Sequence, residues 1–272
     1  MTADRQASSD RSARSRRCGT ADAAADRPTV ELLAAMRLAS QALPIGGFSY
    51  SQGLETAIDR GWVAGEPDAL RWLEELLALN VGRFDAPLLY ALAQAMHEDD
   101  WSTAIELHEL HLASRESGEQ HAESLQMGYS LMKLLQGLHE APPPAAGDRS
   151  DRSMSAGTPL LEASASVAGL PSFAASLPWA WALAGLVFGL SPAQTLTAWL
   201  WSWLENQVMG TLKAVPLGQQ AGQRLMSRLL PRLSGIVAQA QHLPRERWSN
   251  HAPGFALAAC WHETQYSRMF RS

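Results

Sequence analysis

The sequence predicts an all-α protein built as a single compact helical bundle. Apolar residues recur every three or four positions along almost the whole chain after residue 28, which is the spacing of a helix face. No stretch between turn signals alternates polar and apolar residues, as a half-buried strand would. No unit repeats at the periods of helical repeat proteins, so a compact bundle is favoured over a solenoid. We therefore expect one helical domain over residues 29–272.

The first 28 residues are expected to form a disordered N-terminal extension. They are rich in Arg, Asp, Ala and Ser and offer almost no apolar surface to bury. They lack the apolar stretch of a secretory signal, and their acidic residues are atypical of a mitochondrial transit peptide. Translation from Met36 would leave this segment out of the protein, an alternative that the sequence leaves open.

A Gly-Gly turn opens the domain. Pro44, Gly46 and Gly47 predict a tight turn, because glycine reaches backbone angles that other residues avoid. Ser49, followed three residues later by Gln52, has the pattern of a capping box, so we expect the next helix to begin there. A phosphate cradle at this helix start is a weaker interpretation, since no lysine lies nearby.

Further helices are expected between residues 68 and 139. Residues 68–81 carry an apolar stripe after a Glu66-Pro67 start that suits a helix N-terminus. Asp85 is expected to cap the following helix, which has a proline in its first turn. Helical spacing continues over residues 102–116 and 117–139.

The C-terminal half begins with an expected flexible insertion, residues 141–169, which contains three consecutive prolines and several serines. Residues 179–190 form an apolar run of about twelve residues, which predicts a buried helix because a bilayer span needs roughly twenty. Residues 196–208 predict an amphipathic helix whose tryptophans belong to the core rather than to an aromatic ligand cage. That helix is expected to end near Val215, because a residue before proline is pushed out of helical geometry.

Composition excludes several classes of function. The net charge of −5 argues against a nucleic-acid partner, which needs a clustered basic face. The two cysteines, Cys18 and Cys260, imply no disulfide framework and fit a reducing cytoplasm, and Cys260 is expected to be a small buried residue.

The chain lacks a phosphate-binding loop, a dinucleotide-binding glycine motif, a Gly-x-Ser-x-Gly motif and a His-Glu-x-x-His motif. We expect no membrane span and no enzyme activity; an autonomous helical enzyme has no support beyond the pockets that any bundle contains.

Two histidines form the best metal candidate. His108 and His111 are three residues apart, so their rings would share one helix face, with Glu106 before them and His121 downstream. Among eight histidines such a pair arises readily by chance, and a structural role is favoured over metal binding. Lys213 has a similarly simple interpretation, because a cation at a helix C-terminus complements the helix dipole.

The last residues pose the main functional question. The chain ends in WHETQYSRMFRS, with cations, aromatic residues and Met side by side. Large apolar side chains at a terminus need either docking onto their own core or a partner that covers them.

Four segments resemble the UreF family of urease accessory proteins. They are LPIGGFSYSQGLE at 43–55, ESLQMGYSL at 123–131, LWSWLENQVMGTLKAVPLGQQ at 200–220 and the tail at 261–272. The resemblance covers nearly the whole chain from about residue 30 onward. The extension 1–28 and the insertion 141–169 are longer than it requires, and neither interrupts a matched segment.

The resemblance implies a non-enzymatic, all-α, cytoplasmic protein that forms homodimers. It would bind the accessory protein UreD (also called UreH) and recruit and regulate the nickel-carrying GTPase UreG, so that nickel reaches the urease apoprotein. Nickel and GTP would be handled by the partners, and this chain would bind no cofactor. The alternative is a direct nickel metallochaperone that uses His108 and His111.

The resemblance also implies two sets of site residues. The family's tail packs against UreD, which indicates Tyr266, Arg268, Met269, Phe270 and Arg271 here. The family's surface for UreG indicates Ser49, Tyr50, Gln52, Glu55, Lys213 and Gln219.

Overall fold

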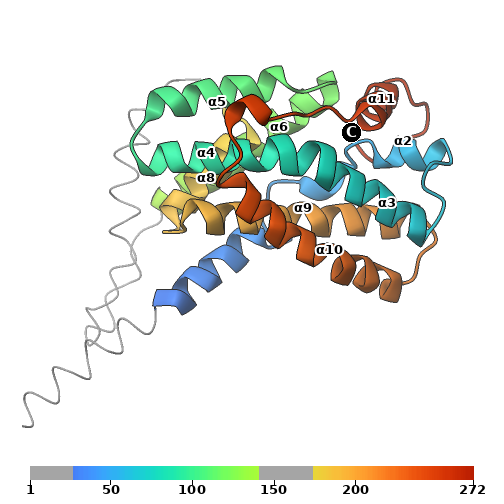
Figure 1. The fold of residues 1–272 in the computed structure, drawn as a ribbon, viewed down its shortest axis with the longest axis horizontal. Helices are drawn as coiled ribbons and strands as arrows, with labels where there is room; N and C mark the ends of the chain where they lie inside the picture. Colours follow the sequence, from blue (N-terminus) through green and yellow to red (C-terminus); the bar gives the residue numbers. More distant parts are fainter. Residues whose placement is uncertain (1–26, 141–173) are drawn as a thin grey trace, which may run out of the picture.

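The computed structural model describes residues 27–140 and 174–272, and within them it contains helices and no strand (Figure 1). The all-α prediction is confirmed. The expected extension 1–28 and insertion 141–169 lie outside the described residues, except that residues 27–28 already belong to a helix over 27–39.

The N-terminal part of the described chain runs through a turn into one long helix. A short 3-10 helix, η1 (Gly47–Ser49), is followed by α2 (Leu54–Asp59). Then α3 (Glu66–Leu76), a π-helical segment (Leu77–Asp85) and α4 (Ala86–His97) follow one another without a break.

Further helices make up the rest of the bundle. They are α5 (Trp101–Ala113), α6 (Gly118–Glu140), α8 (Leu177–Val187), α9 (Pro192–Ala214), α10 (Gln219–Ala240) and α11 (Pro253–His262), with a 3-10 turn, η3 (Arg245–Arg247), before α11. The end of α9 before Val215 and Pro216 confirms the predicted stop.

Two predicted helix starts are wrong. Asp85 caps nothing: the helix passes through it, and its carboxylate accepts a hydrogen bond from Arg115 at 2.9 Å. Pro87 follows closely, and a wide π turn is one way for a helix to continue past a residue without an N–H. Ser49 and Gln52 form no capping box, because α2 begins at Leu54 after Gly53, and the chain is left-handed at Gln52 and Gly53 (φ 53° and 79°). A capping box is present at Ser191 and Gln194, where α9 begins.

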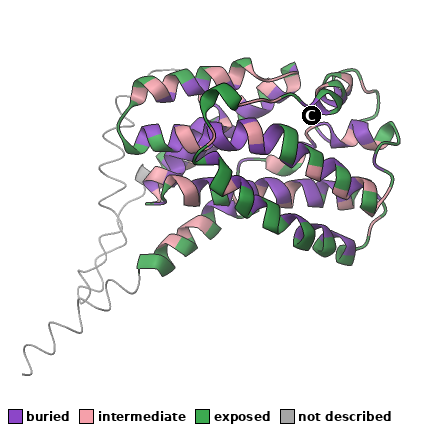
Figure 2. Cartoon of the chain, in the orientation of Figure 1, coloured by how far each residue is buried: buried purple, intermediate pink, exposed green. Residues whose placement is uncertain are grey.

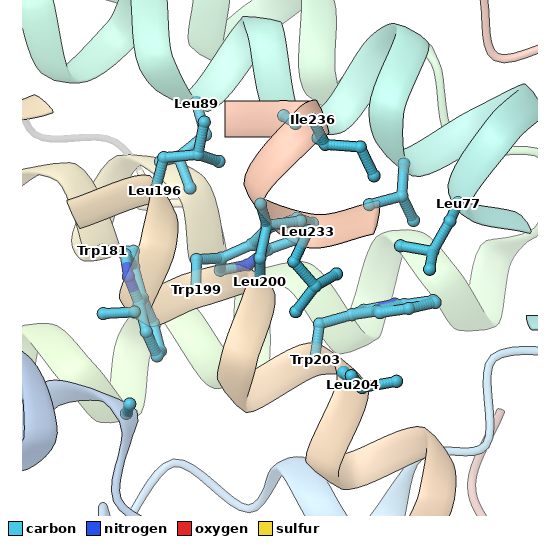
Figure 3. Packing of buried hydrophobic residues seen from close by; sticks show 14 of the residues in the cluster. Leu77, Leu89, Trp181, Leu196, Trp199, Leu200, Trp203, Leu204, Leu233 and Ile236 are labelled. Atoms are coloured by element: carbon cyan, nitrogen blue, oxygen red, sulfur yellow. The ribbon is translucent and has the colours of Figure 1, made fainter. Parts of the chain in front are cut away.

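The core lies where α4, α8 and α9 meet. Helix α8 packs against α4, α6 and α9, and α10 covers α9 on another side. Trp179 and Trp181 of α8 are almost fully buried, as the apolar run predicted. In Figure 3, Leu200 and Trp203 of α9 lie close to Leu233 of α10, and Trp199 and Trp203 are buried. The predicted tryptophan core is confirmed.

The long helix from Glu66 to His97 has the length and apolar composition of a membrane span. However, 72% of its most apolar window is buried inside the fold. Figure 2 shows α4 lined with buried positions in the middle of the bundle. Its apolar residues therefore serve the protein's own core.

Candidate partner-binding site

The C-terminal tail, residues 264–272, folds back onto the turn before α2 (Figure 1). The backbone oxygen of Ser272 accepts hydrogen bonds from the backbone nitrogens of Ser51 and Gln52, at 2.7 and 3.1 Å, and from the Ser51 hydroxyl at 2.5 Å. One residue earlier, the Arg271 nitrogen donates to the Ser49 carbonyl at 2.7 Å. Ser272 is buried, so the tail is docked on its own domain.

A carboxylate of α2 holds the middle of the tail. The two oxygens of Glu55 accept the backbone N–H groups of Met269 at 2.5 Å and Phe270 at 2.9 Å. The Phe270 side chain is buried, and the ammonium of Lys213 lies 4.5 Å from its ring centroid. The tail therefore has a backbone anchor and a side-chain anchor.

The first turn of α6 holds the start of the tail. Glu119 accepts a hydrogen bond from the Arg268 guanidinium at 2.5 Å and contacts the His262 ring at 2.6 Å. In return, the Glu263 carboxylate accepts the backbone N–H groups of Gly118 and Glu119 at the α6 N-terminus. An acidic side chain at a helix N-terminus is stabilising, so α6 and the end of α11 support each other.

The tail also has an outward face. The Tyr266 side chain is completely exposed, Met269 is 52% exposed, and Arg268 and Arg271 are exposed. The inward face, with Phe270 and Ser272, is buried. The inner side of the tail therefore docks on the core of the same chain, and its outer side presents a large aromatic residue and Met to solvent.

The residues predicted to bind the GTPase lie largely beneath or beside the tail. Tyr50 is buried, and its carbonyl accepts a hydrogen bond from Asn206. Gln52 is partly buried, donating to Glu123 at 2.8 Å and accepting from the Trp203 indole at 2.9 Å. Ser49 and Glu55 bind the tail backbone, as described above. Two predicted residues are exposed: Lys213, at the end of α9 beside the Phe270 ring, and Gln219, at the start of α10.

The predicted turn residues have separate roles. Gly46 is left-handed (φ 79°), as the glycine pair predicted. Gly47 is not left-handed, but a Cβ there would lie 3.3 Å from the Met127 methyl group, so a small residue lets this turn approach α6. Pro44 lies in the turn that leads to η1.

The sequence did not indicate three residues that support the tail. Glu119, Glu123 and His262 come from α6 and α11 and meet the tail only in the folded chain. Glu123 accepts a hydrogen bond from the Ser272 hydroxyl at 2.7 Å, and burial raises the pKa of its carboxyl group. Glutamate is common on helices, so the residue type alone did not indicate that Glu119 and Glu123 support the tail.

The histidine pair anchors the start of α8. His108 contacts the Ser176 hydroxyl at 2.9 Å, and His111 contacts the Ser124 hydroxyl at 2.8 Å. Ser176 caps α8, and Ser124 accepts the backbone N–H of Leu177. Burial lowers the pKa of both histidines. Within residues 27–140 and 174–272, no group of three or more His, Cys, Asp or Glu is arranged to hold a metal ion.

Cys260 is exposed on α11, so the prediction that it is a small buried residue is wrong. Its neighbours Ala258 and Ala259 are buried and occupy the inward face of the helix. Helical geometry turns the next position toward solvent.

Comparisons with known proteins agree on one family. The family model described as UreF matches residues 63–230. The urease accessory protein UreF of Ectopseudomonas mendocina (strain ymp) is 48% identical over 239 residues, which cover 88% of this chain and 98% of the relative. The protein of that name from Azotobacter vinelandii (strain DJ / ATCC BAA-1303) is 49% identical over 240 residues, with the same coverage. The one from Dechloromonas aromatica (strain RCB) is 42% identical over 243 residues, covering 89% and 98%.

Proposed function

This chain belongs to the UreF family, and from that membership we propose that it is a non-enzymatic scaffold of urease maturation in the cytoplasm. In this proposal it forms homodimers, binds UreD (UreH), and recruits and regulates the GTPase UreG, so that nickel reaches the urease apoprotein. The names of its relatives support a role as an accessory protein. Nickel and GTP are handled by the partners in this scheme.

The tail's two-sided arrangement is the observation that carries the proposal. The bundle already orders the backbone of residues 269–272 through Glu55, Ser49 and Ser51. Tyr266 and Met269 are nevertheless left exposed. A partner that covers these side chains gains aromatic and apolar contact area. Because folding has already ordered this backbone, binding costs little further conformational entropy. We assign this face, with Arg268 and Arg271 at its edges, to UreD.

The proposed contact with UreG is centred on Lys213 and Gln219. Both side chains are exposed, whereas Tyr50 and Gln52 lie in the layer beneath the tail. Ser49, Tyr50, Gln52 and Glu55 would then act on the GTPase mainly by shaping this surface. Lys213 also contacts the Phe270 ring, so the proposed UreG surface adjoins the tail at this residue pair.

A matched pair of tyrosine variants tests the tail assignment. Tyr266 and Tyr129 are both exposed, and Tyr129 lies on α6 outside the tail. We expect Tyr266→Ala to weaken binding to purified UreD by about tenfold or more, as loss of an interface aromatic anchor does. Tyr129→Ala should leave binding unchanged. Equal affinity of both variants would remove Tyr266 from the interface.

Complementation tests the role as a whole. A nickel-replete strain that has the cognate urease operon but lacks its own UreF would be supplied with this chain. Restored urease activity supports the scaffold role. Soluble expression without activity would argue for a helical scaffold that serves a different metalloenzyme.

The alternative, a direct nickel metallochaperone using His108 and His111, is less well supported by the geometry. Nδ1 of His108 contacts Ser176, Nε2 of His111 contacts Ser124, and both rings are buried. Equilibrium dialysis discriminates the two functions. Nickel bound at one site per chain and lost in the His108→Ala, His111→Ala double variant would favour the alternative.

A further inference from the structure

His262 connects two helices to the tail. It is the last residue of α11, and its ring is fully buried between a carboxylate of α2 and a carboxylate of α6. The Nε2 atom lies 3.1 Å from Glu55, and the Nδ1 atom lies 2.6 Å from Glu119. These two glutamates are the ones that hold the tail backbone at residues 269–270 and the Arg268 guanidinium.

The chemistry of the contacts determines the protonation state of the ring. An ionised carboxylate only accepts hydrogen bonds, and a neutral imidazole has a single N–H. Glu55 accepts two backbone N–H groups, and Glu119 accepts a guanidinium N–H, so both carboxylates act as hydrogen-bond acceptors at this site. Both ring contacts can then be hydrogen bonds only if both ring nitrogens carry a proton.

We propose that His262 is a positioning residue that acts as an imidazolium clamp between Glu55 and Glu119 and thereby holds the tail in its docked conformation. Its effect on partner binding rests on the proposed function of the tail; its effect on the order of the tail does not. Loss of one ring proton leaves a partly buried carboxylate facing a nitrogen lone pair, which weakens the support of residues 268–270.

The other charged groups around the clamp fit this interpretation. Glu55 faces the ring from α2, Glu119 from α6, and Arg268 approaches Glu119 from the tail. Glu263 is adjacent in sequence, but its carboxylate is directed at the α6 N-terminus. Two carboxylates thus contact the ring directly, and the Arg268 guanidinium is itself paired with Glu119.

Nuclear magnetic resonance of the intact wild-type chain tests the clamp directly. The ¹⁵N chemical shifts of the His262 ring distinguish a doubly protonated ring from either neutral form. We expect a doubly protonated ring and slow exchange of the Met269 and Phe270 amides, with faster exchange at pH values where the shifts show that the ring has lost a proton. A neutral ring with these amides still protected would overturn the proposal.

Variants separate the clamp from a role in packing alone. His262→Gln should speed exchange of the Met269 and Phe270 amides by about tenfold, because an amide side chain cannot bridge two carboxylates as a cation. His242→Gln, at an exposed position after α10, is the matched control and should change nothing. Glu119→Gln should flatten the pH dependence of this exchange, since the new amide can donate to Nδ1 of a neutral ring that donates to Glu55. An unchanged pH profile in that variant would contradict the clamp.

Binding to purified UreD, measured over the same pH range, completes the experiment. If the wild-type chain binds and His262→Gln binds about tenfold more weakly, the clamp supports the partner site. If wild type does not bind, the partner assignment fails, while the exchange data still decide whether the clamp exists. Normal binding by His262→Gln, together with unchanged exchange, would remove His262 from any positioning role.

Discussion

The Oε2 atom of Glu55 accepts the backbone N–H of Phe270 at 2.9 Å, across 215 positions of sequence. This hydrogen bond joins the two sets of residues that the family resemblance assigned to different partners. Glu55, Ser49 and Lys213 contact the tail directly, so the predicted UreG surface and the predicted UreD surface share one structure. A partner that moves the tail would therefore also alter the surroundings of Lys213.

The Glu55 carboxylate should be the main anchor of the tail. In Glu55→Gln, one oxygen is replaced by an NH₂ donor that faces a backbone N–H, so we expect the tail to open more often while the bundle stays folded. Hydrogen bonds to a charged group contribute about 1.5–3 kcal/mol. Trypsin should then cut after Arg268 at least about tenfold faster than in wild type.

An exposed glutamate provides the control for this cleavage experiment. Glu106 pairs with Arg245 on the surface, and Glu106→Gln should leave cleavage after Arg268 unchanged. Similar cleavage rates in both variants would show that Glu55 is not the main anchor of the tail.

Two adjacent tail residues should have opposite roles. Phe270 is buried, and replacing a buried Phe by Ala costs about 3–5 kcal/mol when the whole fold depends on the contact. The tail can undock by itself, so we expect a smaller loss, about 1–2 kcal/mol, in the free energy of unfolding of Phe270→Ala. Met269→Ala, at a half-exposed position, should be near neutral for stability and should weaken binding to UreD. Urea denaturation would show whether Phe270→Ala loses more stability than Met269→Ala. Binding assays on both variants would show whether Met269→Ala weakens binding to UreD.

Local patterns predicted the helices well. Helix α9 has the predicted apolar stripe and stops before Pro216, because periodicity and the restriction before proline act within a few residues. The long helix through Asp85 was predicted as two, because a Pro two residues after an Asp is a common start signal and the π segment that overrides it has no simple sequence signature.

The site was predicted only in part, for a physical reason. The family resemblance indicated Tyr266 as a partner-binding residue of the tail, but the sequence did not indicate the residues that support the tail. His262, Glu119 and Glu123 acquire their roles from contacts made between distant helices. Ser49 and Gln52 resembled a local cap, whereas their backbone and side-chain groups serve the tail and the core.

Gly128 should tolerate no side chain. It lies within the matched segment 123–131 on α6, and a Cβ there would lie 2.1 Å from the Ala175 carbonyl oxygen. The start of α8 would have to shift, so we expect Gly128→Ala to lower the free energy of unfolding by about 1–3 kcal/mol or more. Gly137→Ala on the same helix has open space around the new methyl group and should stabilise by about 0.5–1 kcal/mol. Thermal unfolding of the two variants would test the pair, and equal melting temperatures would contradict the close approach.

Glu123 should make the free energy of unfolding fall as pH rises. A glutamate in a surface ion pair has the opposite effect, because its contribution to stability is lost as pH falls. Burial raises the pKa of its carboxyl group in the folded chain, so the folded state binds the proton more tightly than the unfolded state does. Its contribution to stability is therefore fully present below the ordinary pKa of a glutamate and is lost as pH rises through the raised value. Glu123→Gln stays neutral and can still accept the hydrogen bond from Gln52, so that loss should disappear.

Urea unfolding of wild type and Glu123→Gln, from about pH 4.5 to pH 7.5, measures this effect. The difference in unfolding free energy should move in favour of the variant by on the order of 1 kcal/mol as pH rises. Glu246→Gln, at an exposed position in η3, should run parallel to wild type. A gap between Glu123→Gln and wild type that stays constant with pH would mean that Glu123 ionises equally well in the folded and unfolded chains. The hydrogen bonds from Ser272 and Gln52 would then fully offset the cost of burying its charge.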